Sequence, residues 1–292
     1  MLSKKIILTG ASGFIGKHLL TKLLEDNYHV LALKRPESNK VVCAENLIWA
    51  NINDVENHSF INGGVDAIIH LATDYGRSDE GGVISQYMCN VLLPLRLVEL
   101  ARLKKIPLFI SADSFFGKYE YSYMKTYILS KKHFKELAEE LLRDSATGFA
   151  NLRLEHVYGE GDGSKKFIPF IVHALKTSKE QIKCTSGVQR RDFVYVEDVI
   201  NAFIYVLKYH PSNRLVEYEV GTGESHSLKE MIEELKEQLK SDAPVKYGAI
   251  QLRNDEILDS KANIDNLNKL GWHPVYSLKD GVKKMLNKEK IS

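Results

Sequence analysis

Short apolar runs alternate with segments of helical periodicity through the first half of the chain. The apolar runs are rich in Ile, Val and Leu at consecutive positions, as expected of strands that are covered on both faces. They lie at residues 5–9, 29–33, 47–50, 65–70, 106–111 and 148–154. Apolar residues recur at helical spacing at 14–26, 84–104 and 124–143. Strands that alternate with helices predict an α/β fold with a doubly wound parallel sheet.

This alternation ends near residue 155, which predicts a second, smaller lobe. Glycine and charged residues gather in YGEGDGSKKF, residues 158–167. Helical patterns follow, with short strands between them, at 167–177, 197–208, 227–240 and 277–287. We therefore expect a sheet domain at 1–155, to which parts of 188–225 return, and a mixed α/β domain at 156–292. A ligand is expected in the cleft between two such lobes.

Composition narrows the possible partners. The formal net charge is +2 and apolar residues make up 44% of the chain, which allows a packed core and gives no reason to expect nucleic acid as a partner. No apolar run approaches the ~18 residues that span a bilayer, and the N-terminal strand is unlike a signal peptide, so no membrane partner is expected. The three cysteines, Cys43, Cys89 and Cys184, are far apart. Their spacing predicts neither disulfides nor a metal site, and it fits a cytoplasmic location.

A glycine-rich turn joins the first strand to the first helix. In TGASGFIG the glycines are Gly10, Gly13 and Gly16, and Ser12 lies in the same turn. In a dinucleotide-binding βαβ unit, such glycines make the tight turn, let the backbone approach the pyrophosphate, and let the helix pack on the strand. The N–H groups at the start of the helix then face the phosphates. The context favours a cofactor site over a tight turn without a ligand.

The end of the second strand indicates which dinucleotide is bound. An NAD-binding unit usually has Asp or Glu there, which binds the ribose 2′-hydroxyl. This chain has Lys34 and Arg35 at that place and no carboxylate. Because two cations suit a 2′-phosphate, NADP(H) is favoured as the cofactor and NAD(H) stays possible. The alternative interpretation is that Lys34 and Arg35 belong to a solvated basic loop with no role in binding.

Tyr127 and Lys131 form the candidate catalytic pair. A spacing of four places both side chains on one face of a helix. An adjacent ammonium stabilises the phenolate and lowers the pKa of the phenol from its usual value of about 10, so the tyrosine can exchange a proton with a sugar hydroxyl or carbonyl. Tyr123 with Tyr127, and Tyr121 with Lys125, have the same spacing. The position of Tyr127 and Lys131 after the glycine turn and the fifth strand favours this pair.

The chain resembles an extended short-chain dehydrogenase/reductase of the NAD-dependent epimerase/dehydratase group, whose members act on nucleotide sugars. The resemblance covers almost the whole length and rests on segments that recur in order: TGASGFIG, IIHLAT, NVLLPLRLVELA, FISADSFFG, YILSK, LRLEHVYGEGD, RRDFVYVEDV, YEVGTGESHSL and LGWHP. It implies a Rossmann domain for the cofactor and a small C-terminal domain for the nucleotide diphosphate-sugar. It also implies a homodimer built through the helices at 84–104 and 124–143.

The resemblance also implies roles for individual residues. Those that cradle the pyrophosphate are Gly10, Gly13, Phe14, Ile15 and Gly16. Those that line the rest of the cofactor are Asp54, near the adenine, and Leu71, Ala72 and Thr73, after the fourth strand. Tyr127 is the proton donor or acceptor, and Lys131 binds the nicotinamide ribose. Those that hold the substrate are Arg191 and Arg253 at the diphosphate, Lys165 and Lys166 at the nucleotide, and Asp113.

One position departs from the family. A Ser or Thr usually stands five residues before the glycine of FISADSFFG, and its hydroxyl bonds the reacting oxygen. This chain has Ala112 there. Ser111 would point to the opposite face of the strand, so Ser114 is the better substitute for the missing hydroxyl. Thr73 is another candidate for this role. A third interpretation is that the protein has lost catalysis and only binds its ligand. The glutamate that follows Asp113 in dehydratases is Ser114 here, which disfavours water elimination.

These observations lead to one leading hypothesis and two alternatives. We expect an NADPH-dependent reductase of a nucleotide-linked 4-keto-6-deoxy sugar, because a reductase consumes fresh dinucleotide and Lys34 and Arg35 suit NADPH. The first alternative is a nucleotide-sugar 4-epimerase that keeps its NAD bound. The second is a catalytically impaired dinucleotide-binding or sensor protein. The nucleotide base and the product stereochemistry stay open.

Overall fold

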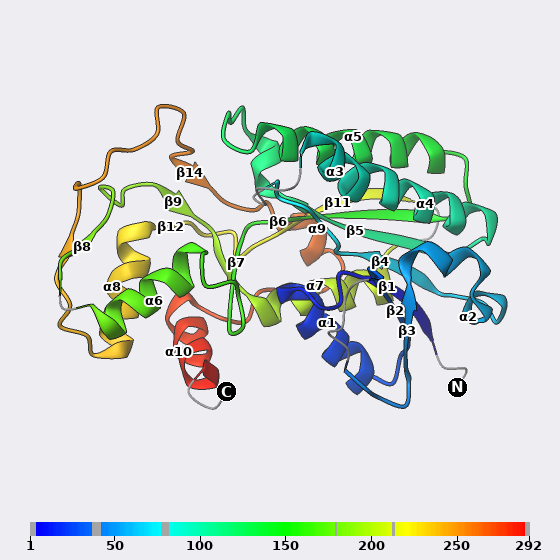
Figure 1. The fold of residues 1–292 in the computed structure, drawn as a ribbon, viewed down its shortest axis with the longest axis horizontal. Helices are drawn as coiled ribbons and strands as arrows, with labels where there is room; N and C mark the ends of the chain where they lie inside the picture. The colour runs from blue at the N-terminus through cyan, green and yellow to red at the C-terminus, as the bar shows by residue number, and fades with distance from the viewer. Residues whose placement is uncertain (1–3, 37–41, 77–81, 179, 212–213, 290–292) are drawn as a thin grey trace.

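A seven-stranded parallel sheet forms the centre of the molecule (Figure 1). The computed structural model describes residues 4–36, 42–76, 82–178, 180–211 and 214–289. In spatial order the strands are β11 (Leu215–Val220), β6 (Gly148–Leu154), β5 (Leu108–Ser114), β4 (Ala67–His70), β1 (Lys5–Thr9), β2 (His29–Lys34) and β3 (Leu47–Asn51). Every neighbouring pair is parallel. The predicted doubly wound α/β class is confirmed.

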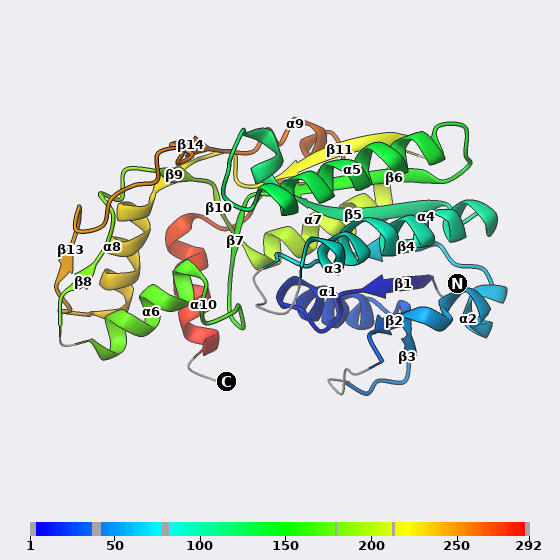
Figure 2. The ribbon, with the colours of Figure 1, turned by 45° about the horizontal axis from the view of Figure 1, so that its top comes forward.

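Helices cover both faces of this sheet, as Figure 2 shows. The first face carries α1 (Phe14–Glu25) and α7 (Val196–Tyr209), which pack together in one apolar core. The second carries α4 (Leu93–Leu103) and α5 (Lys125–Leu142), which pack in another core with α2 (Ser59–Asn62). Because both faces are covered, strand residues such as Ile6, Ile7 and Leu8 are fully buried. This explains why the strands are continuous apolar runs.

The chain reverses its direction across the sheet between β1 and β4. From β1 it proceeds outward to β2 and β3, and it then returns to β4 on the other side of β1. Thr9 and His70 end these two strands and are register partners. A ligand in an open parallel sheet binds outside the carboxyl ends of the strands at such a switch point.

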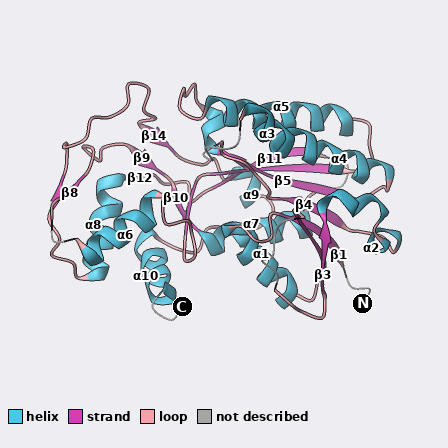
Figure 3. Ribbon diagram, in the orientation of Figure 1, coloured by secondary structure: helices cyan, strands magenta, loops and turns pink. Residues whose placement is uncertain are grey.

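A smaller lobe of helices and short strands lies at one end of the sheet (Figure 3). Its helices are α6 (Phe167–Thr177), α8 (Leu228–Leu239) and α10 (Leu278–Glu289). Its strands are β7 (His156–Tyr158), β8 (Ile182–Lys183), β9 (Arg190–Arg191), β10 (Phe193–Tyr195), β12 (His226–Ser227), β13 (Val245–Lys246) and β14 (Asp259–Ser260). The segment 196–220 adds α7 and β11 to the sheet layer, and α9 (Asp265–Asn268) contacts β11. The domain boundary at residue 155 stays a prediction.

The helix predicted at 84–104 has three parts. These are α3 (Val83–Tyr87), a π-helical turn η2 (Met88–Leu92) and α4, with Pro94 in the first turn of α4. By length and composition Val83–Leu103 is apolar enough to cross a membrane, so the expectation that no segment approaches that length is wrong. Part of its surface packs on the sheet through Leu97, Val98 and Ala101, which are buried.

Candidate active site

The glycine-rich turn after β1 has no room for side chains. A Cβ on Gly10, whose φ is +71°, would lie 2.7 Å from the Ala72 nitrogen, and one on Gly16 would lie 1.9 Å from the Gly10 oxygen. Gly13 caps α1, and its N–H donates to the Gly10 oxygen at 2.9 Å. The bare backbone at the start of α1 therefore forms a cradle that fits the pyrophosphate of a dinucleotide. Phe14, Ile15 and the exposed Ser12 are part of this turn.

Thr9 fixes the segment that faces this turn, although the sequence did not single it out. Its hydroxyl accepts hydrogen bonds from the backbone N–H groups of Leu71 and Ala72, both at 3.2 Å, and contacts His70 Nδ1 at 2.9 Å. Because Thr9 ends β1, the predicted cofactor-lining residues after β4 are held beside the glycines. The sequence feature that could have identified Thr9 is its position at the start of TGASGFIG.

Asn90 holds the next residues of the same segment. It is fully buried on the π-helical turn η2. Its Oδ1 accepts from the Asp74 N–H at 2.8 Å and from the Thr73 hydroxyl at 3.2 Å, while its Nδ2 donates to the Asp74 carbonyl at 2.8 Å and to Ser130 Oγ at 3.1 Å. The π-helical turn thus presents an amide that fixes the loop after β4. The sequence motif NVLLPLRLVELA begins with this residue, which was the available signal.

Tyr127 lies where Thr73 and Ser114 meet. Its side chain is 3% exposed, and the hydroxyls of Thr73 and Ser114 lie close enough to its hydroxyl to affect its pKa. β5 extends to Ser114, so Ser114 and Ala112 lie on the same face of that strand. Ser111 lies on the opposite face, where its hydroxyl donates to Asn151 Oδ1 at 2.7 Å and is buried. The structure therefore brings Ser114 to Tyr127 and places the candidate Ser111 in the core.

The pKa of Tyr127 is the reverse of the prediction. Burial, followed by the proximity of Tyr75 and Asp113, raises it well above 10, while the nearby Thr73 and Ser114 hydroxyls oppose the rise. The Lys131 ammonium donates to the Ala112 carbonyl at 3.0 Å. Burial lowers the pKa of Lys131 itself. Tyr127 therefore keeps its proton at neutral pH.

The candidates for the adenosine end of the cofactor lie at the carboxyl ends of the outer strands. Lys34 is the last residue of β2, Arg35 follows it and is exposed, and Asn51 of β3 is the register partner of Lys34. Asp54 is exposed on η1 (Ile52–Asn57), which follows β3 directly. These residues share the edge of the sheet that carries the glycine turn.

Arg191 and Arg253, the two candidates for binding the substrate diphosphate, both contact other protein side chains. Arg191 is buried, and its guanidinium forms an ion pair with Glu256 at 2.6 Å. Arg253 lies over the Tyr123 ring at 3.8 Å and donates to the Tyr121 hydroxyl at 2.8 Å. The structure thus holds both guanidinium groups with protein partners.

The other substrate candidates are divided between two places. Lys166 pairs with Asp162 at 2.9 Å and lies 5.5 Å from the centre of the Phe14 ring, so it approaches the glycine turn. Its neighbour Lys165 is exposed. Asp113 accepts from the Ser114 N–H at 2.7 Å and from Asn151 Nδ2 at 3.1 Å, which turns its carboxylate toward β6. The roles of these residues stay predictions.

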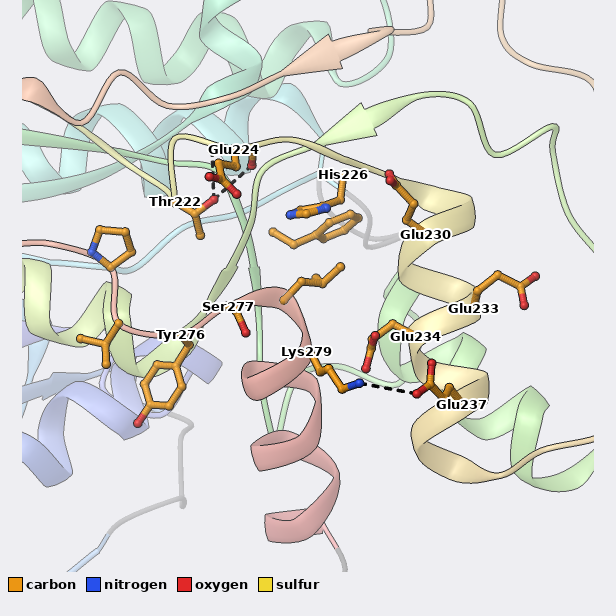
Figure 4. A pocket seen from close by; sticks show the side chains of 14 residues that line it. Thr222, Glu224, His226, Glu230, Glu233, Glu234, Glu237, Tyr276, Ser277 and Lys279 are labelled. Atoms are coloured by element: carbon orange, nitrogen blue, oxygen red, sulfur yellow. Dashed lines mark hydrogen bonds and ion pairs between the residues drawn. The ribbon is translucent and has the colours of Figure 1, made fainter.

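A pocket of about 680 Å³ lies between α8 and the start of α10, away from the candidate residues (Figure 4). Glu230, Glu233, Glu234 and Glu237 line it, and Lys279 reaches Glu237 at 3.6 Å. It contains none of the predicted site residues, so we place the candidate site at the sheet edge and not here.

His70 is expected to make the protein sensitive to acid. It is 1% exposed, and burial, with a smaller effect of Lys131, lowers its pKa to about 3. An unfolded histidine takes up a proton as the pH falls below 6.5, whereas the folded one does not, so the unfolding free energy falls by about 1.4 kcal/mol per pH unit in this range. Urea unfolding at pH 7 and pH 5 should show the advantage of the wild type over His70→Asn shrinking by about 2 kcal/mol. An advantage independent of pH would contradict this expectation.

The chain matches known proteins along most of its length. The model of the NAD dependent epimerase/dehydratase family matches residues 6–221. A CDP-abequose synthase of Salmonella muenchen is 45% identical over 289 residues, which is 98% of each protein. A CDP-abequose synthase of Salmonella typhimurium is 39% identical over 298 residues, which cover 98% of this chain and 99% of the relative.

A solved structure shares the fold. The UDP-glucose 4-epimerase of Thermotoga maritima, solved with UDP-glucose, has a TM-score of 0.83 at 22% identity, covering 99% of this chain and 100% of the other. At this identity the likeness shows the fold alone. Together with the strand order, it agrees with the class that the sequence predicted.

Proposed function

The chain belongs to the NAD dependent epimerase/dehydratase family, and we propose that within it the protein is an NADPH-dependent reductase of a nucleotide-linked 4-keto deoxysugar. The observation that carries this proposal is the likeness to two CDP-abequose synthases, which are 45% and 39% identical over 98% of this chain. A reductase needs a tyrosine that begins with its proton and gives it to the reacting oxygen. Tyr127, whose pKa is raised by burial, holds its proton and can fill this role.

The residues around Tyr127 have complementary roles in this reduction. When bound, the reduced nicotinamide supplies the hydride that goes to the keto carbon. Tyr127 gives its proton to the carbonyl oxygen, so the C=O group becomes a CH–OH group. Thr73 and Ser114 orient the hydroxyl, and Lys131 stabilises the phenolate until a proton from solvent restores the phenol.

The substrate follows from the chemistry of the relatives' product. Abequose is a 3,6-dideoxyhexose, and removing hydride and a proton from its C4 carbinol leaves a 4-keto group. We therefore propose CDP-linked 4-keto-3,6-dideoxyhexose as the substrate, with two relatives named CDP-abequose synthase as support. The sequence predicted a nucleotide-linked 4-keto-6-deoxy sugar. The proposal now specifies two further features of that substrate: its base is cytosine, and its sugar has no hydroxyl at C3.

Absorbance at 340 nm separates the candidate functions. A reductase should consume one NADPH for each CDP-linked 4-keto-3,6-dideoxyhexose. An epimerase should instead interconvert UDP-glucose and UDP-galactose without net cofactor use. A sensor protein should bind dinucleotide and turn over neither substrate.

NADPH preference is expected to depend on Arg35. An Arg35→Glu substitution places a carboxylate at the end of β2, where it repels a 2′-phosphate and can accept from a 2′-hydroxyl. We expect kcat/KM for NADPH to fall at least about tenfold, while kcat/KM for NADH is unchanged or rises. Steady-state rates with both dinucleotides measure this, with Lys17→Glu, an exposed position on α1, as the charge-matched control. An equal effect of Arg35→Glu on both dinucleotides would contradict the preference.

We also propose a cytoplasmic homodimer. Ile84, Met88 and Leu92 are exposed at intervals of four residues along α3 and η2, and Leu129 and Leu137 are exposed on the neighbouring α5. Two such helices on each copy can bury these side chains as a four-helix bundle. Light scattering should give the mass of two chains for the wild type and of one chain for Met88→Glu, because a carboxylate in that contact is costly to bury. The mass of one chain for the wild type would contradict the dimer.

A further inference from the structure

Tyr75 lies directly against the reactive tyrosine. The two ring centroids are 5.0 Å apart and the ring planes are inclined by 32°. Tyr127 is almost completely buried, whereas Tyr75 is 42% exposed. Tyr75 therefore offers an aromatic surface to solvent within about the width of one sugar ring of the Tyr127 side chain.

The backbone on both sides of Tyr75 is fixed. Asp74 is held by the paired hydrogen bonds with Asn90, and Gln86 Nε2 donates to the Asp74 carbonyl at 3.4 Å. The Gly76 N–H donates to Asp74 Oδ1 at 2.8 Å, and its φ of +66° turns the chain beside Gln86. Because the residues before and after it are tied down, the Tyr75 ring is presented from a preorganised loop.

Thr73 and Tyr75 approach Tyr127 from the same segment. The Thr73 hydroxyl lies close enough to the Tyr127 hydroxyl to affect its pKa, while the Tyr75 ring lies against the Tyr127 ring. If the reacting oxygen lies at the Tyr127 hydroxyl, the 5.0 Å separation of the two ring centroids lets the carbon next to the reacting carbonyl reach the Tyr75 ring. A ring face packs well on a CH₂ group, but a hydroxyl pressed against it would lose its hydrogen bonds with water.

We infer that Tyr75 contacts the sugar ring of the substrate and selects sugars that lack a hydroxyl beside the reacting carbon. This inference rests on the proposed function, because it places the sugar carbonyl at Tyr127. It assigns to Tyr75 the preference for a 3,6-dideoxy sugar over a 6-deoxy sugar that keeps its 3-hydroxyl. A hydrophobic contact of this size is worth roughly one to two orders of magnitude in kcat/KM.

The first test compares CDP-linked 4-keto-3,6-dideoxyhexose with the CDP-linked 4-keto-6-deoxyhexose in NADPH oxidation. We expect Tyr75→Ala to lower kcat/KM at least about tenfold for the dideoxy sugar and less than about threefold for the hydroxylated one. Tyr75→Phe keeps the ring and should stay within about threefold of the wild type on both. Tyr209→Ala, at an exposed tyrosine on α7, is the matched control and should change neither value. Equal losses of Tyr75→Ala on both sugars, or no loss, would overturn the inference.

The second test measures binding without turnover. Titration calorimetry with CDP and with a CDP-linked 3,6-dideoxyhexose should show that Tyr75→Ala leaves the Kd of CDP within about twofold and weakens the sugar-linked ligand at least about fivefold. An unchanged ratio of the two Kd values would overturn the inference. The proposed function fails separately, if the wild type oxidises no NADPH with either keto sugar, and the calorimetry then still decides whether Tyr75 contacts the sugar.

Discussion

Replacing Tyr127 by phenylalanine is expected to lower kcat for NADPH oxidation by about 10²- to 10⁴-fold, the usual contribution of a positioned proton donor. The substitution removes one oxygen from a buried ring and leaves the packing against Tyr75 in place. The Thr73 hydroxyl keeps its bond to Asn90, so the fold should be retained. The expected fall in kcat therefore reports the missing proton donor and not a change in the structure.

Two controls make this result specific. NADPH should raise the melting temperature of Tyr127→Phe as it does that of the wild type, because a ligand that binds only the folded state stabilises it. Tyr209→Phe, at an exposed position on α7, should retain full activity. If Tyr127→Phe kept more than about a tenth of the wild-type kcat, another group would be the proton donor.

A methyl group on Gly16 is expected to abolish tight dinucleotide binding. The new Cβ would meet the Gly10 oxygen at 1.9 Å, the Gly10 carbonyl carbon at 2.7 Å and the Ala11 Cα at 2.9 Å. These are all backbone atoms, so α1 or the turn has to shift. We expect the Kd for NADPH to rise at least about a hundredfold, or about 2.7 kcal/mol, together with a lower melting temperature.

Gly82→Ala provides the matched control for Gly16→Ala. A Cβ on Gly82 would meet no atom within 4 Å, and Gly82 has a φ of −70°. Dinucleotide binding, measured by the quenching or enhancement of nicotinamide fluorescence, should be unchanged in this variant. Binding of NADPH to Gly16→Ala with the wild-type Kd would show that the turn does not hold the pyrophosphate.

The fold was predictable because its central strands are buried on both faces. Runs such as 5–9 and 148–154 coincide with β1 and β6, since most positions of a strand between two helix layers are apolar, although Asn151 and Arg153 interrupt β6. The last three residues of β5, Ala112–Ser114, were missed because Asp113 and Ser114 are polar and the apolar run ends before them. That error affected the site, since Ser114 reaches Tyr127 only when the strand continues to it.

The site could be predicted as far as local spacing determines it. The glycine turn and the four-residue spacing of Tyr127 and Lys131 lie within single elements, so the sequence shows them. The pairing of Arg191 with Glu256 joins segments that are 65 residues apart, and no local pattern contains it. The direction of the Tyr127 pKa was wrong because desolvation depends on burial by the whole fold.

The central claim is tested most directly by following the hydride. NADPH carrying deuterium at both positions of nicotinamide C4 is incubated with the enzyme and CDP-linked 4-keto-3,6-dideoxyhexose, and the sugar is examined by NMR. The account predicts one deuterium at C4 of the product and one NADPH consumed for each sugar reduced. Unlabelled product, or interconversion of UDP-glucose and UDP-galactose with no loss of NADPH, would contradict it.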